Sequence, residues 1–203
     1  MCLFTRHSSH AVCMGSGVAP RLQHPLRIVS RNAARQLRPL TPIMRITLFA
    51  IGRLKAGPES ELSTRYLDRF AKAGSAIGLD FARVIEVAES RAASADLRKR
   101  EEATQLERNL PDGAALILLD ERGKTPDSPE FADRLAQLRD DGRRDLVLAI
   151  GGPDGLDPAL HARADAVICF GRMTWPHQLV RIMAAEQLYR AVTILSGHPY
   201  HRS

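Results

Sequence analysis

Three short apolar runs in the second half of the chain constrain the fold most. They are AALILLD at 114–120, DLVLAIGG at 145–152 and AVICFG at 166–171. Unlike a half-exposed strand, they do not alternate between apolar and polar residues, and such runs are typical of strands that are buried on both faces of a parallel sheet. Amphipathic segments separate them, which indicates an α/β protein with a mostly parallel sheet flanked by helices.

The remaining periodic segments complete an alternation of strands and helices. The patterns predict further strands at 45–52 and 80–89, and helices at 58–74, 94–109, 128–142, 158–165 and 176–197. The last helix is the longest of these and ends at Gly197. No internal repeat or second domain is indicated.

Residues 1–43 differ from the rest of the chain in charge. They contain six arginines and no acidic residue, whereas the remainder holds 23 basic and 23 acidic residues. The net charge of +6 therefore belongs to this segment, and any RNA-binding surface of the body must be a local patch. We expect 1–43 to be a disordered basic extension. It is a transit-like segment, a phosphate-binding arm, or sequence upstream of a natural start at Met44, which we favour because a strand opens there.

The number of cysteines and the lengths of the apolar runs indicate the cellular compartment. Cys2 and Cys13 lie in the extension and only Cys169 in the body, so no disulfide framework is expected. Cys169 stands in an apolar run, which predicts a buried core thiol. No apolar run approaches the roughly 20 residues that cross a bilayer. We expect a cytoplasmic protein with no membrane association.

Three strand ends carry glycine or polar residues: DERGK, GGPDGLDP and GRMTWPHQ. In open parallel sheets, ligands bind beyond the carboxyl ends of the strands. The paired glycines of GGPDG allow the backbone to approach a ligand closely. The motif is neither a dinucleotide fingerprint nor a P-loop. From these residues alone, a tight strand-to-helix turn remains an alternative.

The chain ends in HPYHRS, a chemically capable terminus. Its two histidines are three residues apart, but without a third ligand they are a weak zinc signal, so we predict no metal site. On the preceding helix Arg181 is a basic candidate, while Glu186 and Arg190 have the spacing of an ordinary i,i+4 ion pair.

Taken together, MRITLFAIG, LAIGGPDGL and TWPHQLVRIMAAEQLYRAVTILSGHPYHR resemble the SPOUT-class methyltransferases that methylate N3 of a pseudouridine in large-subunit ribosomal RNA. The resemblance covers Met44 to Arg202 and implies a single domain at 44–203. It implies an α/β fold with a C-terminal trefoil knot, S-adenosyl-L-methionine as cofactor, and a homodimer whose partner is ribosomal RNA in the large subunit or the assembled ribosome.

The resemblance also implies the site residues. The cofactor pocket would be formed by Leu119, Gly152, Gly171, Arg172, Met173, Thr174, Trp175 and Pro176. Trp175 stands where relatives often carry leucine, so the resemblance does not fix how this larger side chain packs.

The tail would supply the catalytic groups. His201 or His198 would take the proton of N3, Tyr200 would stack on or hydrogen-bond the base, and Arg202 would meet a phosphate or a uracil oxygen, with Arg181 as a second basic candidate. A tail that only closes the dimer interface remains an alternative. So do a methyltransferase for another RNA site and a non-catalytic RNA-binding module of the same fold.

Overall fold

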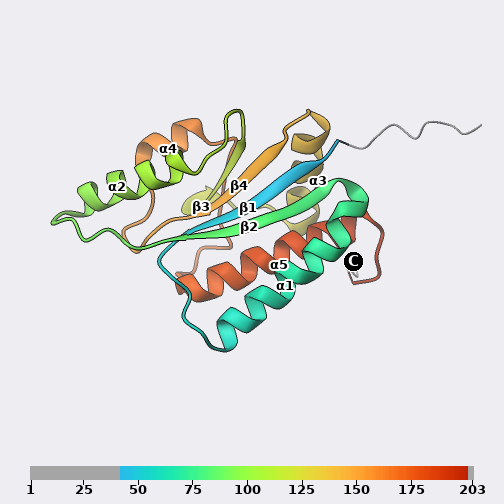
Figure 1. The fold of residues 1–203 in the computed structure, drawn as a ribbon, viewed down its shortest axis with the longest axis horizontal. Coiled ribbons are helices and arrows are strands. Elements are labelled where there is room, and N and C mark those ends of the chain that lie inside the picture. The colour runs from blue at the N-terminus through green and yellow to red at the C-terminus, as the bar shows by residue number, and fades with distance from the viewer. Residues whose placement is uncertain (1–41, 201–203) are drawn as a thin grey trace, which may run out of the picture. The chain divides into compact units, whose positions relative to one another are not determined.

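The computed structural model describes residues 42–200, so the disorder expected for 1–43 concerns residues that lie almost entirely outside the described part. Figure 1 shows the elements. In chain order they are β1 (Met44–Ile51), α1 (Pro58–Gly74), a short 3-10 helix (Ser75–Ile77), β2 (Leu79–Val87), α2 (Ala95–Arg108), β3 (Ala115–Lys124), α3 (Ser128–Asp140), β4 (Asp145–Ile150), α4 (Pro158–Arg163), β5 (Ala166–Ile168) and α5 (His177–Leu195).

The strands of residues 42–200 form one five-stranded sheet in the order β2-β1-β4-β3-β5, and each neighbouring pair is parallel. Helices α1, α3 and α5 cover one face, and α2 and α4 cover the other (Figure 1). The predicted α/β class with a mostly parallel sheet is confirmed. The knot that the resemblance implies stays a prediction.

Successive residues of the central strands enter two different cores, as the period of two in a strand requires. In β3, Ile117 packs toward α1, α3 and α5, whereas Leu116 and Leu118 pack toward α2 and α4. The apolar runs are continuous because both faces of these strands are covered.

The element ends differ from the predictions in three informative places. β3 continues through the polar DERGK segment to Lys124, and β5 ends at Ile168, earlier than the apolar run suggests. At the start of α3, Asp127 rather than Ser128 is the N-cap, and it forms a capping box with Glu130.

Gly123 marks where β5 crosses the end of β3. A Cβ atom at Gly123 would lie 2.5 to 2.7 Å from backbone atoms of Ile168. The backbone N–H of Cys169 then donates to the carbonyl oxygen of Lys124 at 2.7 Å. The missing side chain therefore permits a backbone-to-backbone approach that brings segments 120–124 and 168–176 together.

Within residues 42–200, no helix is long and apolar enough to cross a membrane.

Candidate functional site

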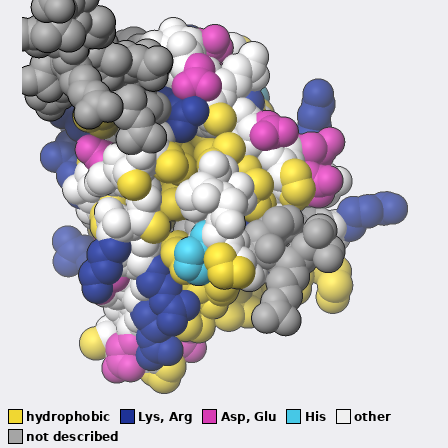
Figure 2. Space-filling model, turned by 90° about the vertical axis from the view of Figure 1, so that its right-hand side faces the viewer, with side chains coloured by type: hydrophobic (Ala, Val, Ile, Leu, Met, Phe, Trp, Pro, Cys, Tyr) yellow, Lys and Arg dark blue, Asp and Glu magenta, His cyan; other side chains and the backbone are white. Residues whose placement is uncertain are grey.

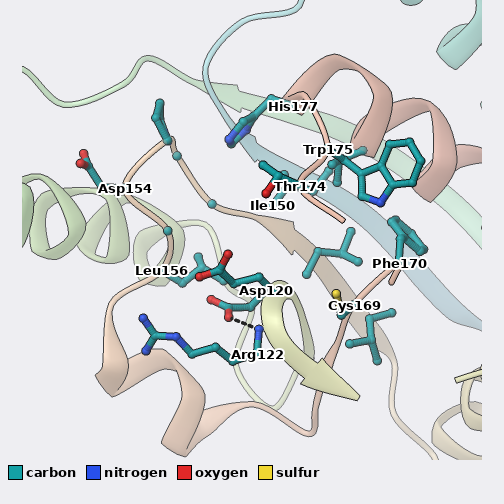
Figure 3. A pocket seen from close by; sticks show the side chains of 18 of the residues that line it. Asp120, Arg122, Ile150, Asp154, Leu156, Cys169, Phe170, Thr174, Trp175 and His177 are labelled. Atoms are coloured by element: carbon teal, nitrogen blue, oxygen red, sulfur yellow. Dashed lines mark hydrogen bonds between the residues drawn. The ribbon is translucent and has the colours of Figure 1, made fainter. Parts of the chain in front are cut away.

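A cavity of about 250 Å³ opens at the carboxyl ends of β3, β4 and β5 (Figure 3). Its walls come from the end of β3, the segments after β4 and β5, and the first turn of α5: residues 119–122, 150–156, 168–170 and 173–175, with His177 and Val180. These are the three strand ends that the sequence singled out. The sheet order places β4, β3 and β5 side by side, so their loops converge on one site.

The lining fits the cofactor that the resemblance implies. S-adenosyl-L-methionine combines a flat adenine ring with a positively charged sulfur and an amino acid end. The cavity offers apolar walls for the ring: Leu119, Ile150, Leu156, Ile168, Phe170, Met173, Trp175 and Val180. Three lining carboxylates (Asp120, Glu121 and Asp154) face one lining guanidinium, that of Arg122. This negative balance suits a positively charged ligand.

Five of the eight predicted cofactor residues line this cavity: Leu119, Gly152, Met173, Thr174 and Trp175. Gly171, Arg172 and Pro176 belong to the same loop but do not line it. The structure thus brings these residues to one loop cluster, while their binding of the cofactor stays a prediction.

The loop before α5 exposes large apolar side chains. Met173 is 74% exposed and Trp175 is 37% exposed, and both lie at the mouth of the cavity. Trp175 therefore does not cap the core, which leaves its indole ring available to a flat ligand.

Cys169 departs from its prediction. It is half-buried and lines the cavity, and its Sγ donates to the carbonyl oxygen of Gly171 at 2.9 Å. The predicted core thiol is wrong because β5 ends one residue earlier, at Ile168, so the chain has already left the sheet.

Helix α2 holds the GGPDG loop from behind. Arg98 makes a bidentate contact with Asp154, at 2.6 and 2.9 Å, and this contact lowers the pKa of Asp154. The buried carboxylate of Glu102 accepts the backbone N–H of Ser90 at 3.0 Å. Burial is the main cause that raises the pKa of Glu102.

Gly152 lies directly against the Glu102 carboxylate. A Cβ atom at position 152 would lie 2.6 Å from Oε2 of Glu102. A side chain at this position would displace the Glu102 carboxylate or the loop itself. Gly155 closes the loop with a φ of 86°, a left-handed conformation that glycine adopts without strain, and its N–H donates to the carbonyl oxygen of Gly152 at 2.9 Å.

His177, at the first position of α5, lines the cavity and was not among the predicted site residues. Burial and then the charge of Arg181 lower its pKa, while Glu89 opposes them. The imidazole is therefore neutral at neutral pH and can accept a proton. The TWPHQ segment was noted as a strand end, but nothing in the sequence distinguishes this histidine from those of the tail.

Arg181 is 4% exposed and its guanidinium is committed to the carboxyl ends of β1 and β2. It donates to the carbonyl oxygens of Ile51 at 2.9 Å and Gly52 at 2.7 Å, and it pairs with Glu86. Arg181 does not line the cavity. Its catalytic role stays a prediction, whereas its contacts are those of a residue that ties α5 to the sheet.

The described part of the tail folds back along α5. The hydroxyl of Tyr200 donates to Glu186 at 3.2 Å, and its ring centroid lies 4.9 Å from that of Tyr189. Burial, and then the neighbouring Tyr66 and Glu186, raise the pKa of Tyr200 to about 12. His198 is exposed, and its Nδ1 accepts the N–H of Tyr200. Glu186 also forms the expected ion pair with Arg190.

Two predicted catalytic residues, His201 and Arg202, lie outside the described residues. Neither Tyr200 nor His198 lines the cavity. Glu186, the partner of Tyr200, lies about nine residues, or roughly 14 Å of helix, beyond His177. Within one chain, Tyr200 is therefore separated from the cavity that it was predicted to serve.

Comparisons with known proteins agree with the sequence resemblance. A family model described as a predicted SPOUT methyltransferase matches residues 44–201. A protein of Sinorhizobium medicae called ribosomal RNA large subunit methyltransferase H is 73% identical over 160 residues, which cover 79% of this chain and 100% of that protein. Its namesake from Rhizobium meliloti is 74% identical over 160 residues, with the same coverage.

Among solved structures, the SpoU methyltransferase AviRb from Streptomyces viridochromogenes, in complex with AdoMet, aligns with a TM-score of 0.37 and 16% identity. The alignment covers 78% of this chain and 60% of that chain.

Proposed function

The chain belongs to the SPOUT methyltransferase family, and we propose that it is an enzyme that methylates large-subunit ribosomal RNA with S-adenosyl-L-methionine as methyl donor. The observation that carries this proposal is the identity of about 70% over the full length of relatives that bear this activity in their names. The cavity at the carboxyl ends of β3, β4 and β5 supplies a site of the required chemistry. Within the family resemblance, the acceptor is N3 of a pseudouridine.

When bound, the cofactor supplies a methyl group on a positively charged sulfur, and loss of that methyl group leaves a neutral thioether. The protein must then hold the acceptor nitrogen in line with the methyl carbon, which is work of proximity and orientation. The glycine-rich loop at 151–155 presents backbone groups to the cavity, and α2 keeps that loop in place through Arg98.

N3 of a uracil ring carries a proton that must leave for the nitrogen to attack. His177 is positioned at the cavity and is kept neutral by its surroundings. It joins His198 and His201 as a candidate acceptor of that proton. Arg202 stays the candidate for binding a phosphate or a uracil oxygen. Tyr200 stays the candidate for stacking on the base or hydrogen-bonding it.

We place the tail of one subunit over the cavity of a second subunit. In one chain Tyr200 packs against the middle of α5, away from the cavity. A homodimer resolves this separation, because a second copy can bring its tail to the site. Figure 2 views the side of the molecule on which the C-terminal end of α5 lies. Hydrophobic side chains gather there, with Lys and Arg as well as Asp and Glu side chains around them.

We further propose that the substrate is presented by the assembled ribosome in the cytoplasm. Residues 44–203 carry equal numbers of basic and acidic side chains. Affinity for free RNA rises with the number of phosphates that are neutralised, so a body without net charge gains little from that source. A preformed ribosomal surface compensates by presenting the nucleotide in one orientation.

Mass spectrometry of ribosomal RNA from a strain that lacks the gene tests the activity. The methyl group on the pseudouridine should disappear and return with the wild-type gene. If the pseudouridine keeps its methyl group in the deletion strain, the substrate assignment is wrong. If purified protein binds no S-adenosyl-L-methionine in calorimetry, the chain acts as an RNA-binding module instead.

A mixing experiment tests the shared site. One variant is truncated after Gly197, and the other carries Gly152→Val, whose side chain would collide with Glu102. Each homodimer should be inactive, and the truncated protein should still fold and bind cofactor. Co-expressed subunits should regain activity, because a mixed dimer holds one complete site. No recovery in mixed dimers of verified composition would contradict a site shared between subunits.

A further inference from the structure

Asp120 places a nearly buried carboxylate in the wall of the cavity. It follows the buried part of β3, and its side chain is only 7% exposed although it borders open space. Figure 3 shows the carboxylate beside the cavity, hydrogen-bonded to Arg122 within its own loop. A charged group of this kind is costly to bury unless it is well paired.

The pairing of Asp120 is incomplete. One carboxylate oxygen, Oδ1, accepts the backbone N–H of Arg122 at 2.9 Å. The other, Oδ2, lies 3.2 Å from Nε2 of His161 on α4, which is an ion pair when that imidazole is protonated, but the two groups do not have the geometry of a hydrogen bond. A carboxylate can accept about four hydrogen bonds. Asp120 therefore keeps acceptor capacity that its protein neighbours do not use.

The other two carboxylates of the lining are less suited to a ligand. Asp154 is engaged in a bidentate contact with Arg98. Glu121 is exposed, so water and salt screen its charge. Asp120 is thus the lining carboxylate that is both nearly buried and not engaged by a guanidinium.

Resting on the proposed function, we infer that Asp120 is the residue by which the cavity distinguishes the positively charged methyl donor from its neutral product. The two molecules differ by one methyl group and one unit of positive charge. A weakly screened carboxylate acts on that charge difference wherever the sulfur lies in the cavity, because attraction in a low-dielectric site extends over several ångströms.

Transfer would then weaken the hold on the cofactor. In the transfer, the bonding electrons of the carbon–sulfur bond would stay on sulfur, the methyl carbon would bond to nitrogen, the N3 proton would pass to a base, and the bound molecule would lose its positive charge. Asp120 in this way favours binding of the donor before reaction and exchange of the product after it.

Calorimetry on the full chain measures the discrimination. The Asp120→Asn variant keeps an oxygen that can accept the N–H of Arg122 but removes the charge. We expect the affinity for S-adenosyl-L-methionine to fall about ten-fold or more, and that for S-adenosyl-L-homocysteine by less than about three-fold. The control is Asp112→Asn, an exposed residue just before the amino end of the same strand, which should leave both affinities unchanged.

The inference would be overturned if a folded Asp120→Asn variant had the same ratio of donor affinity to product affinity as the wild-type protein. This holds even if the wild-type protein methylates its substrate normally. Failure of the wild-type protein to bind either molecule would instead overturn the proposed function. Wild-type protein also offers a test without any variant. An analogue with an ammonium group in place of the methyl sulfonium should bind more tightly than the neutral thioether, and equal binding would count against Asp120 as the discriminating residue.

Discussion

Arg181 donates a hydrogen bond of 2.7 Å to the carbonyl oxygen of Gly52, joining the second turn of α5 to the end of β1. The same guanidinium reaches Ile51 and Glu86, so three acceptors converge on one buried side chain. This contact ties the helix that begins at the cavity to β1 and to the edge strand β2. It gives Arg181 a structural duty that does not require contact with RNA.

Replacing Arg181 by methionine should therefore reduce stability strongly. The change leaves buried carbonyl oxygens and the Glu86 carboxylate without their donor. We expect a loss of about 3 kcal/mol in the free energy of unfolding, measured by urea denaturation. Arg65→Met, on the exposed face of α1, is the control and should cost less than about 0.5 kcal/mol. A stable Arg181→Met protein that lacks only methyl transfer would favour a catalytic role.

Gly123→Ala should disrupt the crossing of β3 and β5. The added methyl group would lie within 2.7 Å of the Ile168 backbone, and neither segment can yield without moving a cavity loop. We expect a loss of about 2 kcal/mol or more in the free energy of unfolding, together with weaker cofactor binding.

Gly113→Ala is the matched control for that variant, because nothing lies within 4 Å of its Cβ position. Its cost should be limited to about 1 kcal/mol from the left-handed backbone, and cofactor binding should stay normal. Equal effects of the two substitutions on cofactor binding would argue against the close crossing.

Glu102 should make stability depend on pH in a defined direction. Burial raises its pKa in the folded protein, so the folded state holds its proton more tightly than the unfolded state does. The stabilisation is complete below the pKa of the unfolded chain and is lost as pH rises through the higher pKa of the folded protein. Glu102→Gln should remove this loss, so its stability relative to wild type should increase with pH. Parallel pH profiles of the two proteins would contradict the assignment.

His177→Gln tests the proton acceptor of the cavity. If His177 takes the N3 proton, the turnover number should fall about 100-fold or more while cofactor affinity changes by less than about three-fold. Because burial and Arg181 lower the pKa of His177, wild-type activity should persist below pH 6.5 and decline only as pH falls through that lowered value.

The same two quantities, the turnover number and the cofactor affinity, are measured for His198→Gln, which removes a histidine of the tail. A normal turnover number in His177→Gln, with a strong loss in His198→Gln, would return the role to the tail.

The sequence by itself determined the elements of this fold. The continuous runs around Ile117 and Leu148 predicted strands that are buried on both faces, and both strands do contribute to two cores. The glycines and the proline of GGPDG predicted a tight turn after β4, and the N–H of Gly155 closes that turn on Gly152. These inferences succeed because the period of two in a strand, the need to cover apolar faces and the steric freedom of glycine act over short stretches of chain.

Only the tertiary structure decided which side chains share a site. Asp120 and His161 lie on different elements, and His177 lines the cavity together with Asp120, although α3, β4, α4 and β5 separate them along the chain. The order β4-β3-β5 creates this neighbourhood, and Gly123 allows it only because the backbone of Ile168 passes where a side chain would stand. Long-range packing also buries the Asp120 side chain, separates Tyr200 from the cavity and directs the hydrogen bonds of Arg181 to β1. Local periodicity does not encode such packing.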